Sequence, residues 1–273
     1  MLRRRLAVAA ALCCWPVSGG AQNHAAAALL SSAVIRRRLE AVPSKVADRR
    51  RELENLFREA GCAPHLIEQP VPHESQPNII CVLPGDSPGE ILAGGHFDLV
   101  PAGDGAVDDW SGASLLPSLF ETLKTARRRH TFVFIAFAAE ETGLRGSKAY
   151  VKSLPAQQRG GIRAMVNLEC LGLALPKVWA SRADPNLLKL YNRVAASLGI
   201  PSEGVNVDAV GDDDSHPFLD AHVPVITIHS VTVQTLAILH SPRDNLSAIH
   251  PDDYYQTYKL AARYLSALDS ALQ

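Results

Sequence analysis

Apolar and charged residues first recur at helical spacing, which predicts two helices near the start of the chain. The pattern covers residues 22–60, where Pro43 and Ser44 divide it into two segments and Gly61 ends the second. We expect these helices to form an outer layer. Strand-like runs follow at residues 65–71, 78–83 and 90–97. Clusters of Pro, Gly and Asn separate these runs and predict hairpin-like connections between them.

From residue 111 onwards, helical and strand-like patterns alternate. Strands are predicted at 131–138, 162–168 and 224–229, and helices from 111, at 146–154, at 185–198 and from 251. Such alternation is typical of a sheet covered by helices on both faces. No Pro/Ser-rich linker or repeat interrupts residues 22–273. We therefore predict one α/β domain with a mixed, mostly parallel central sheet.

The chain is long and apolar enough to bury a full core, with 273 residues of which 47% are hydrophobic and 20% charged. Its 27 basic and 28 acidic residues give a formal net charge of -1. This balance lacks the basic excess of a nucleic-acid binder, so we expect no nucleic-acid partner.

The first residues have the pattern of a secretory signal. Three consecutive arginines at 3–5 precede an apolar stretch at 6–17, and small residues follow up to Ala21. The apolar stretch is too short to span a bilayer. We therefore predict a signal peptide at 1–21, no membrane insertion after its removal, and a secreted or periplasmic protein.

The chain after residue 21 keeps three cysteines, Cys62, Cys81 and Cys170, and no C-x-x-C pair. This number excludes a cysteine zinc cage and a disulfide framework. At most one disulfide is possible, and we do not predict that it forms.

Histidine and carboxylate side chains stand directly after strand-like runs or in glycine-rich loops. The segments are G-G-H-F-D at 94–98, D-G-A-V-D-D-W-S-G at 104–112, A-A-E-E-T-G at 138–143, N-L-E-C at 167–170 and L-H-S-P-R-D-N at 239–245. A single carboxylate at a strand end is usually only solvated, but five such segments in one chain favour a common function. Because ligands collect at the carboxyl ends of parallel strands, these segments are candidates for a site.

His96 and Asp98 can share one face of a strand end, so that the carboxylate holds one imidazole nitrogen while the other binds a metal. Alone, this H-x-D signal is weak, and a structural histidine is the simpler explanation. Asp108 by itself fits an ordinary polar turn. Glu169 as a strand-end acid and His240 as a loop histidine also have simple structural explanations.

Glu140 and Glu141 follow the run T-F-V-F-I-A-F. Adjacent residues at a strand end point to different sides, so one carboxylate can ligate a metal while its neighbour addresses a water molecule. The structural alternative is an exposed acidic pair stabilised by the dipole of the next helix.

Taken together, two histidines and three carboxylates suit zinc in a hydrolytic site, and one carboxylate bridging two ions would serve all five ligands. Rival motifs are missing from the sequence, which has no H-E-x-x-H, no G-x-S-x-G and no P-loop. A glycosidase pair would use two acids but not the histidines.

The five segments, by their order and approximate spacing across most of residues 75–273, resemble metallopeptidase family 28, which contains zinc aminopeptidases and glutaminyl cyclases. The resemblance implies a zinc-exopeptidase-like fold. It also implies that His96, Asp108 and Glu169 hold one zinc ion, while Asp108, Glu141 and His240 hold a second. Asp108 would bridge both ions.

The resemblance gives two further residues catalytic roles, with Glu140 as the general base and Asp98 supporting the metal site. Glu169 stands where the family has Asp and is one methylene longer, which leaves open whether one or two zinc ions are bound. The family loop commonly has a cis peptide after the bridging Asp, which here implies one between Asp108 and Asp109.

One segment departs from the family pattern. D-D-S-H-P-F at 213–218 differs from the family's S-D-H-x-P-F, so we expect Asp214 and His216 beside the site at best. Side-chain preference is poorly encoded. Four aromatic residues could line a pocket for the substrate side chain: Trp110, Phe218, Tyr254 and Tyr255. Aromatic residues near helices more commonly pack in the core or on the surface.

The resemblance implies a secreted zinc aminopeptidase that removes amino-terminal residues from peptides, with Glu140 moving the proton of the attacking water. The alternatives are a zinc-dependent glutaminyl cyclase and a non-catalytic binding domain. The segment T-G-L-R-G-S at 142–147 and the complete ligand set favour the peptidase. The sequence does not indicate an oligomeric state.

Overall fold

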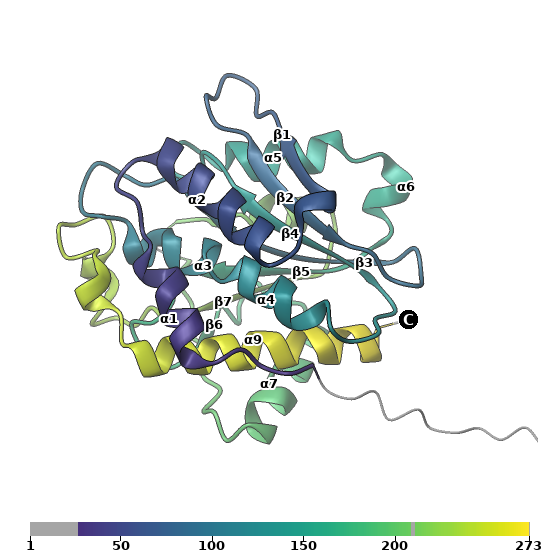
Figure 1. Ribbon diagram of the computed structural model, residues 1–273. Helices are drawn as coiled ribbons and strands as arrows, with labels where there is room; N and C mark the ends of the chain where they lie inside the picture. The colour runs from purple at the N-terminus through teal and green to yellow at the C-terminus, as the bar shows by residue number, and fades with distance from the viewer. Residues whose placement is uncertain (1–26, 209–210, 273) are drawn as a thin grey trace, which may run out of the picture.

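The computed structural model describes residues 27–208 and 211–272, so the predicted signal peptide lies outside the described residues. Its centre is a seven-stranded sheet in the order β1-β2-β4-β3-β5-β7-β6 (Figure 1). The strands are β1 (Leu66–Gln69), β2 (Asn78–Leu83), β3 (Glu90–His96), β4 (Thr131–Phe137), β5 (Ile162–Glu169), β6 (Lys177–Val178) and β7 (Val225–His229).

The four central strands run parallel, since β3 pairs in parallel with β4 and β5, and β5 pairs in parallel with β7. The outer strands β1, β2 and β6 pair antiparallel with their neighbours. The predicted mixed sheet with a mostly parallel centre is therefore confirmed. The two-residue edge strand β6 was not predicted because its pattern is too short to detect.

The predicted hairpins are only half right. β1 and β2 are antiparallel neighbours, with Leu66 opposite Cys81 and Gln69 opposite Asn78. β2 and β3, however, are separated by β4. β3 instead lies between two parallel neighbours, β4 and β5, which both come later in the chain.

Helices cover both faces of the sheet, as predicted (Figure 1). They are α1 (Ser32–Glu40), α2 (Val46–Glu59), α3 (Ser111–Ala113), α4 (Leu116–Leu123), α5 (Arg145–Ser153), α6 (Ala156–Arg159), α7 (Pro185–Ser197), α8 (His216–Asp220) and α9 (Pro251–Ala271). Side chains of β4 alternate between the two faces. Phe132, Phe134 and Ala136 join a core that includes α2, α4, α7 and α9, while the alternate residues pack with α5 and α8.

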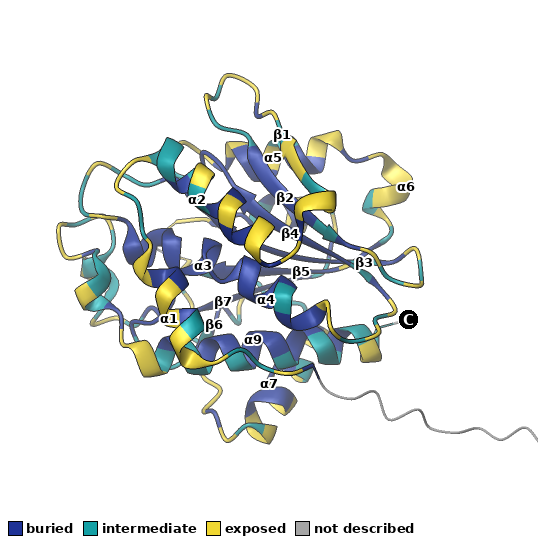
Figure 2. Ribbon diagram, in the orientation of Figure 1, coloured by how far each residue is buried: buried dark blue, intermediate teal, exposed yellow. Residues whose placement is uncertain are grey.

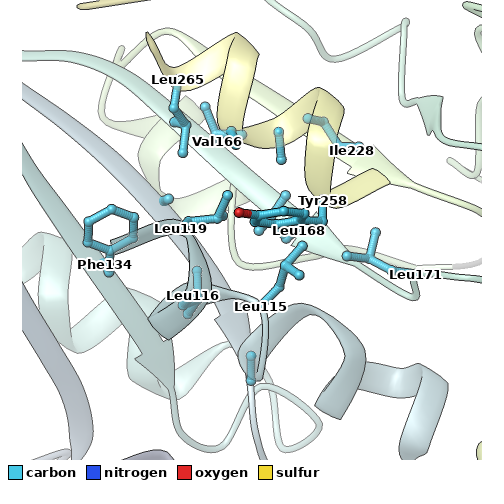
Figure 3. Packing of buried hydrophobic residues seen from close by; sticks show 14 of the residues in the cluster. Leu115, Leu116, Leu119, Phe134, Val166, Leu168, Leu171, Ile228, Tyr258 and Leu265 are labelled. Atoms are coloured by element: carbon cyan, nitrogen blue, oxygen red, sulfur yellow. The ribbon is translucent and has the colours of Figure 1, made fainter. Parts of the chain in front are cut away.

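The larger core lies between the sheet and the long helix α9. Figure 3 shows Leu116 and Leu119 of α4 and Leu265 of α9 lying over Phe134 of β4 and Val166 of β5. In Figure 2 the central strands are mostly dark, the edge strand β1 is partly exposed, and exposed residues lie on the outer sides of the helices. Each such aliphatic side chain stabilises the fold by about 1.5–3 kcal/mol. This rigid core fixes the strand ends that carry the site.

Local sequence explains where the main helices begin. Ser31 accepts a hydrogen bond from the Val34 N–H at the start of α1, and Asp184 caps the N–H groups of Asn186 and Leu187 at the start of α7. Pro251 occupies the first turn of α9. Among the described residues, no helix is both long and apolar enough to cross a membrane.

A disulfide joins Cys62 to Cys81, although we did not predict one. Both residues are fully buried, and the bond ties the end of the α2 segment to strand β2. The pairing could not be inferred from three cysteines, because it depends on β1 folding back onto β2 and bringing residue 62 over the sheet. Cys170 is free and buried.

Candidate metal centre

The predicted site residues gather at the carboxyl ends of the parallel strands. His96 ends β3, Glu169 ends β5, and Glu140 and Glu141 directly follow β4. His240 lies in the loop after β7. The parallel order of the central strands brings these segments to one edge of the sheet, as expected for a ligand site in an α/β fold.

Asp108 lies between the two histidines. Its Oδ1 is 3.1 Å from Nε2 of His96, and its Oδ2 is 3.1 Å from Nε2 of His240. The peptide bond between Asp108 and Asp109 is cis, as the resemblance implies. Each oxygen of one carboxylate therefore faces a different imidazole, which is the arrangement required of a bridging ligand.

Each histidine also faces a glutamate. Nε2 of His96 is 3.4 Å from Oε1 of Glu169, and Nε2 of His240 is 3.2 Å from Oε2 of Glu141. Two ligands on bonds of about 2.0 Å in a tetrahedral zinc site are about 3.3 Å apart. The spacing of these nitrogen and oxygen atoms thus fits two adjoining zinc sites, one on each side of Asp108.

Asp98 links the first histidine to the pair of glutamates. Its Oδ1 accepts a hydrogen bond from the Glu140 N–H at 3.0 Å and its Oδ2 accepts one from the Glu141 N–H at 3.1 Å. Oδ1 also lies 3.5 Å from Nδ1 of His96. One carboxylate thereby holds the turn after β4 and lies beside the His96 ring.

The two adjacent glutamates face different histidines. Oε2 of Glu140 lies 3.9 Å from Nε2 of His96, whereas Glu141 contacts His240. An oxygen of each glutamate nevertheless lies within 4.8 Å of the other and of a His96 ring nitrogen, so the two carboxylates are neighbours whose nearest histidine contacts differ. One of them can serve as a ligand while the other stays free to address a reacting group.

Burial, together with crowded negative charge, sets the electrostatics of the site. Burial, the charge of Asp214 and the other site carboxylates raise the pKa of Glu140 to about 10, and burial with the charge of Asp108 raises the pKa of Glu141 to about 7. Burial lowers the pKa of His96, but the surrounding carboxylates outweigh it and hold that pKa above its usual value. Buried carboxylates around two imidazoles form a donor set that favours a divalent cation.

Asp109 is a supporting residue that sequence reasoning missed. Its Oδ2 accepts a hydrogen bond from the His96 N–H, and its Oδ1 accepts bonds from the N–H groups of Gly112 and Cys170. It thus ties the ends of β3 and β5 to the start of α3. Only the acidic doublet in the sequence marked this position.

Asp244 and Arg49 hold the loop that carries Asp108. The Asp244 carboxylate accepts hydrogen bonds from the Val107 N–H at 2.7 Å and the Asp108 N–H at 3.3 Å. The buried guanidinium of Arg49 donates to the carbonyls preceding this loop, and burial lowers its pKa to about 10 against the opposing charge of Asp244. No local pattern in α2 marks Arg49 as part of the site.

A cavity of about 450 Å³ opens beside the cluster. Asp108, Glu140, Glu141, Glu169 and His240 line one side of it. Apolar side chains line much of the rest, contributed by Leu144, Trp179, Val207, Val231, Leu236 and Leu239. The cavity can therefore hold a ligand with a polar reacting group and an apolar portion.

The aromatic residues considered for this pocket lie elsewhere. Trp110, Phe218 and Tyr254 are fully buried in the hydrophobic cores, and the Tyr255 hydroxyl donates to the Leu30 carbonyl. Their usual role as core packing therefore prevails. The pocket wall comes instead from loop residues such as Trp179, whose pattern carried no signal.

Asp214 and His216 differ in their relation to the site. Asp214 is fully buried, and burial raises its pKa well above the usual range, with further contributions from the charges of Glu169 and Asp98. His216 is partly exposed and its Nδ1 lies 2.8 Å from Oδ1 of Asp212. Only Asp214 thus belongs to the surroundings of the cluster.

A model of peptidase family M28 matches residues 78–265 of the chain. Leupeptin-inactivating enzyme 1 of Streptomyces exfoliatus is 33% identical over 151 residues, covering 54% of this chain and 34% of that protein. The chain spans about a third of the length of the curated relatives it matches first.

Solved structures share the fold. A zinc aminopeptidase from Bacillus subtilis aligns with a TM-score of 0.65 at 23% identity, covering 72% of this chain and 50% of that one. The glutaminyl cyclase of Porphyromonas gingivalis aligns with a TM-score of 0.70 at 21% identity, covering 86% of this chain and 96% of that one. At these identities the likeness concerns the fold alone.

Proposed function

The chain belongs to peptidase family M28, and from this premise we propose that it is a zinc aminopeptidase. The observation that carries the proposal is the position of Asp108, whose two oxygens each lie 3.1 Å from a different histidine. A single bridging carboxylate between two nitrogen and oxygen clusters suits a pair of zinc ions.

In this proposal His96, Asp108 and Glu169 hold one zinc ion, while Asp108, Glu141 and His240 hold the other. When bound, the ions supply Lewis-acid chemistry that polarises a carbonyl and makes water more acidic. Glu169 reaches its histidine despite the extra methylene, because Asn167 Nδ2 donates to its Oε2 at 3.1 Å and leaves Oε1 toward His96. Two ions per chain are therefore expected rather than one.

The proton transfers fall to Glu140. Its backbone N–H is anchored by Asp98, and its carboxylate faces the His96 side of the cavity without being needed as a ligand. It can take the proton of the attacking water and give it to the leaving amine. Asp98 is the positioning residue for both this turn and the His96 ring.

The proposed substrates are peptides with an unblocked amino terminus and an apolar first side chain. The apolar wall of the cavity, including Trp179, Leu236 and Leu239, would receive that side chain. The acidic cluster beside this wall suits a positively charged amino group.

We also propose that the protein is exported. The signal pattern at 1–21 supports this, and so does the buried Cys62–Cys81 bond, because structural disulfides form and persist in oxidising compartments. Mass spectrometry of protein recovered outside the cytoplasm should find a chain that begins after residue 21 and contains the bond. An intact amino terminus or reduced cysteines would contradict export.

Three peptides distinguish the proposed reaction from its alternatives. A peptide beginning with leucine should lose that residue, and its amino-acetylated counterpart should stay intact. A peptide beginning with glutamine should not lose ammonia without shortening, since that product would identify a glutaminyl cyclase. Binding of all three without any product would instead indicate a non-catalytic domain.

A further inference from the structure

A second cavity adjoins the one beside the metal cluster. It has a volume of about 410 Å³ and is lined by residues of helices α5, α6 and α8. Leu144, Lys148 and Asp212 line both cavities, so the two meet at these residues. The other lining residues are Val151, Lys152, Arg159, His216, Pro217 and Asp220. A ligand bound at the cluster can therefore extend along α5 into the second cavity.

Three basic side chains give the second cavity an excess of positive charge. They are Lys148, Lys152 and Arg159. Within residues 27–208 and 211–272 none of the three has a carboxylate as an ion-pair partner. The acids of the cavity face other groups, since Asp212 Oδ1 lies 2.6 Å from Nη1 of Arg182 and Asp220 Oδ1 lies 3.5 Å from Nε2 of His216. The three basic side chains are therefore available to an anionic group of a ligand.

The row of basic side chains leads away from the metal cluster. Helix α5 begins just after the turn that carries Glu140 and Glu141, at the carboxyl end of β4. The chain continues through α6 to the amino end of β5, and β4 and β5 both run parallel to β3. Helix α5 therefore runs from the sheet edge that carries the cluster toward the opposite edge. Lys148 and Lys152 lie on the same face of α5, about 6 Å apart along its axis, and Arg159 follows in α6.

The proposed reaction directs the two parts of a peptide toward different walls. Glu140 returns a proton to the leaving amine, so the part of the peptide after the first residue departs on the Glu140 side. Leu144 and Lys148 follow Glu140 along the chain and line the same cavity. The apolar wall proposed for the first side chain comes from other segments, which include Trp179 and Leu239. The remainder of the peptide is therefore directed toward α5 and the second cavity.

The charges of a short peptide match this arrangement. Its amino terminus is positive and its carboxyl terminus negative, while the site is acidic at the metal cluster and basic along α5. An extended chain spans about 3.3–3.6 Å per residue, so the distance of about 6 Å between the two lysines corresponds to about two residues. Peptides of about two to four residues would thus place a carboxylate beside Lys148 or Lys152.

We propose that Lys148, Lys152 and Arg159 form a binding site for the carboxyl terminus of short peptides. The protein then favours substrates of about two to four residues that have a free carboxyl group. This inference rests on the proposed function and names its substrate class. The bound carboxylate stays outside the reacting bond, so the site acts on substrate affinity rather than on proton transfer. In longer peptides the terminal carboxylate lies beyond the row, and the preference disappears.

Hydrolysis of a leucyl tripeptide and of its amide by the full-length protein tests the inference. The kcat/KM for Leu-Gly-Gly should exceed that for Leu-Gly-Gly amide by about 3–10-fold, with the difference in KM, because each exposed ion pair contributes modestly. Salt at about 1 M should remove the difference, because it screens exposed charges. For a peptide of about ten residues, the acid and the amide should be cleaved equally well.

Charge removal on two different helices distinguishes a local site from a general field. The doubly substituted Lys148→Gln/Lys152→Gln should bring the acid-to-amide ratio of kcat/KM close to one, and Lys148→Arg/Lys152→Arg should keep the parent ratio. The matched control is Lys189→Gln/Arg193→Gln on helix α7. It has the same spacing, removes the same net charge and lies at a separate surface hollow, so it should also keep the parent ratio.

Several results would overturn the inference. Equal kcat/KM for the tripeptide and its amide in the parent would do so, as would a ratio that Lys148→Gln/Lys152→Gln keeps or that the α7 control loses equally. The proposed function would stand in each case, because both peptides would still lose leucine. A protein that releases leucine from neither peptide would overturn the proposed function and this inference together.

Discussion

Replacing Asp98 by asparagine should weaken the metal site from a position that touches no proposed ion. The two Asp98 oxygens accept the N–H groups of Glu140 and Glu141, and one of them also faces Nδ1 of His96. Asparagine keeps one accepting oxygen and turns an NH₂ group toward the other N–H. Its side chain also lacks the negative charge beside the imidazole.

The expected magnitudes follow from these contacts. A buried N–H that loses its acceptor costs about 1–3 kcal/mol, so the free energy of unfolding should fall by about that amount in Asp98→Asn. Loss of a carboxylate that orients a metal-binding histidine typically lowers metal affinity or activity about 10–100-fold. We expect zinc affinity and kcat/KM to fall within that range.

The chain offers a matched control at the other end of strand β4. Asp269 accepts the N–H groups of Arg129 and His130 at 2.9 and 2.7 Å, and it lies 3.1 Å from Nδ1 of His130. Asp269→Asn therefore removes the same contacts far from the cluster. It should lower the free energy of unfolding similarly while leaving zinc affinity unchanged.

Denaturant titration and zinc titration of both variants show whether Asp98 supports zinc binding or only stability. If Asp98→Asn binds zinc like the parent and differs from it only in stability, as Asp269→Asn should, Asp98 is a structural residue. The argument that it positions His96 and the Glu140 turn would then be wrong.

Four other perturbations have defined outcomes. Glu140→Gln should lower turnover by about 10² to 10⁴-fold with zinc content unchanged. Glu141→Gln should lower both turnover and zinc content, and added zinc should partly restore its activity. Loss of zinc from Glu140→Gln alone would contradict the roles proposed for the two glutamates. Replacing both Cys62 and Cys81 by alanine should lower the free energy of unfolding by about 3 kcal/mol, as expected for a bond spanning 19 residues, and an unchanged denaturation midpoint would contradict this. A chelator should abolish peptide hydrolysis and added zinc should restore it, so full activity in the metal-free protein would exclude the proposed chemistry.

Much of the fold could be predicted because its elements have strong local patterns. The run that forms β4 is rich in aromatic and branched residues, and Pro43 and Gly61 mark helix boundaries. Strand order could not be predicted in the same way. Whether β3 pairs with β2 or β4 depends on which strands bury its two edges, and no local pattern contains that information.

The site residues also divide into those that local sequence patterns predicted and those that they did not. The five proposed ligands stand at strand ends or in recognisable motifs, and the structure brings them together. Asp109, Asp244 and Arg49 were missed because each acts on a backbone segment far away in the sequence. Their roles arise only once the loop around Asp108 is folded. The acidic doublet at 108–109 and the segment at 239–245 marked the positions of Asp109 and Asp244 but not these roles, and no pattern marked Arg49.

Zinc content per chain, measured on the purified parent and on single-residue variants, tests the bridged pair of metal sites most directly. The parent should hold close to two zinc ions, and His96→Ala and His240→Ala should each hold close to one. Asp108→Ala should retain less zinc than either, because both proposed sites share that carboxylate. A parent without zinc, or an Asp108→Ala variant that keeps both ions, would contradict a site built around Asp108.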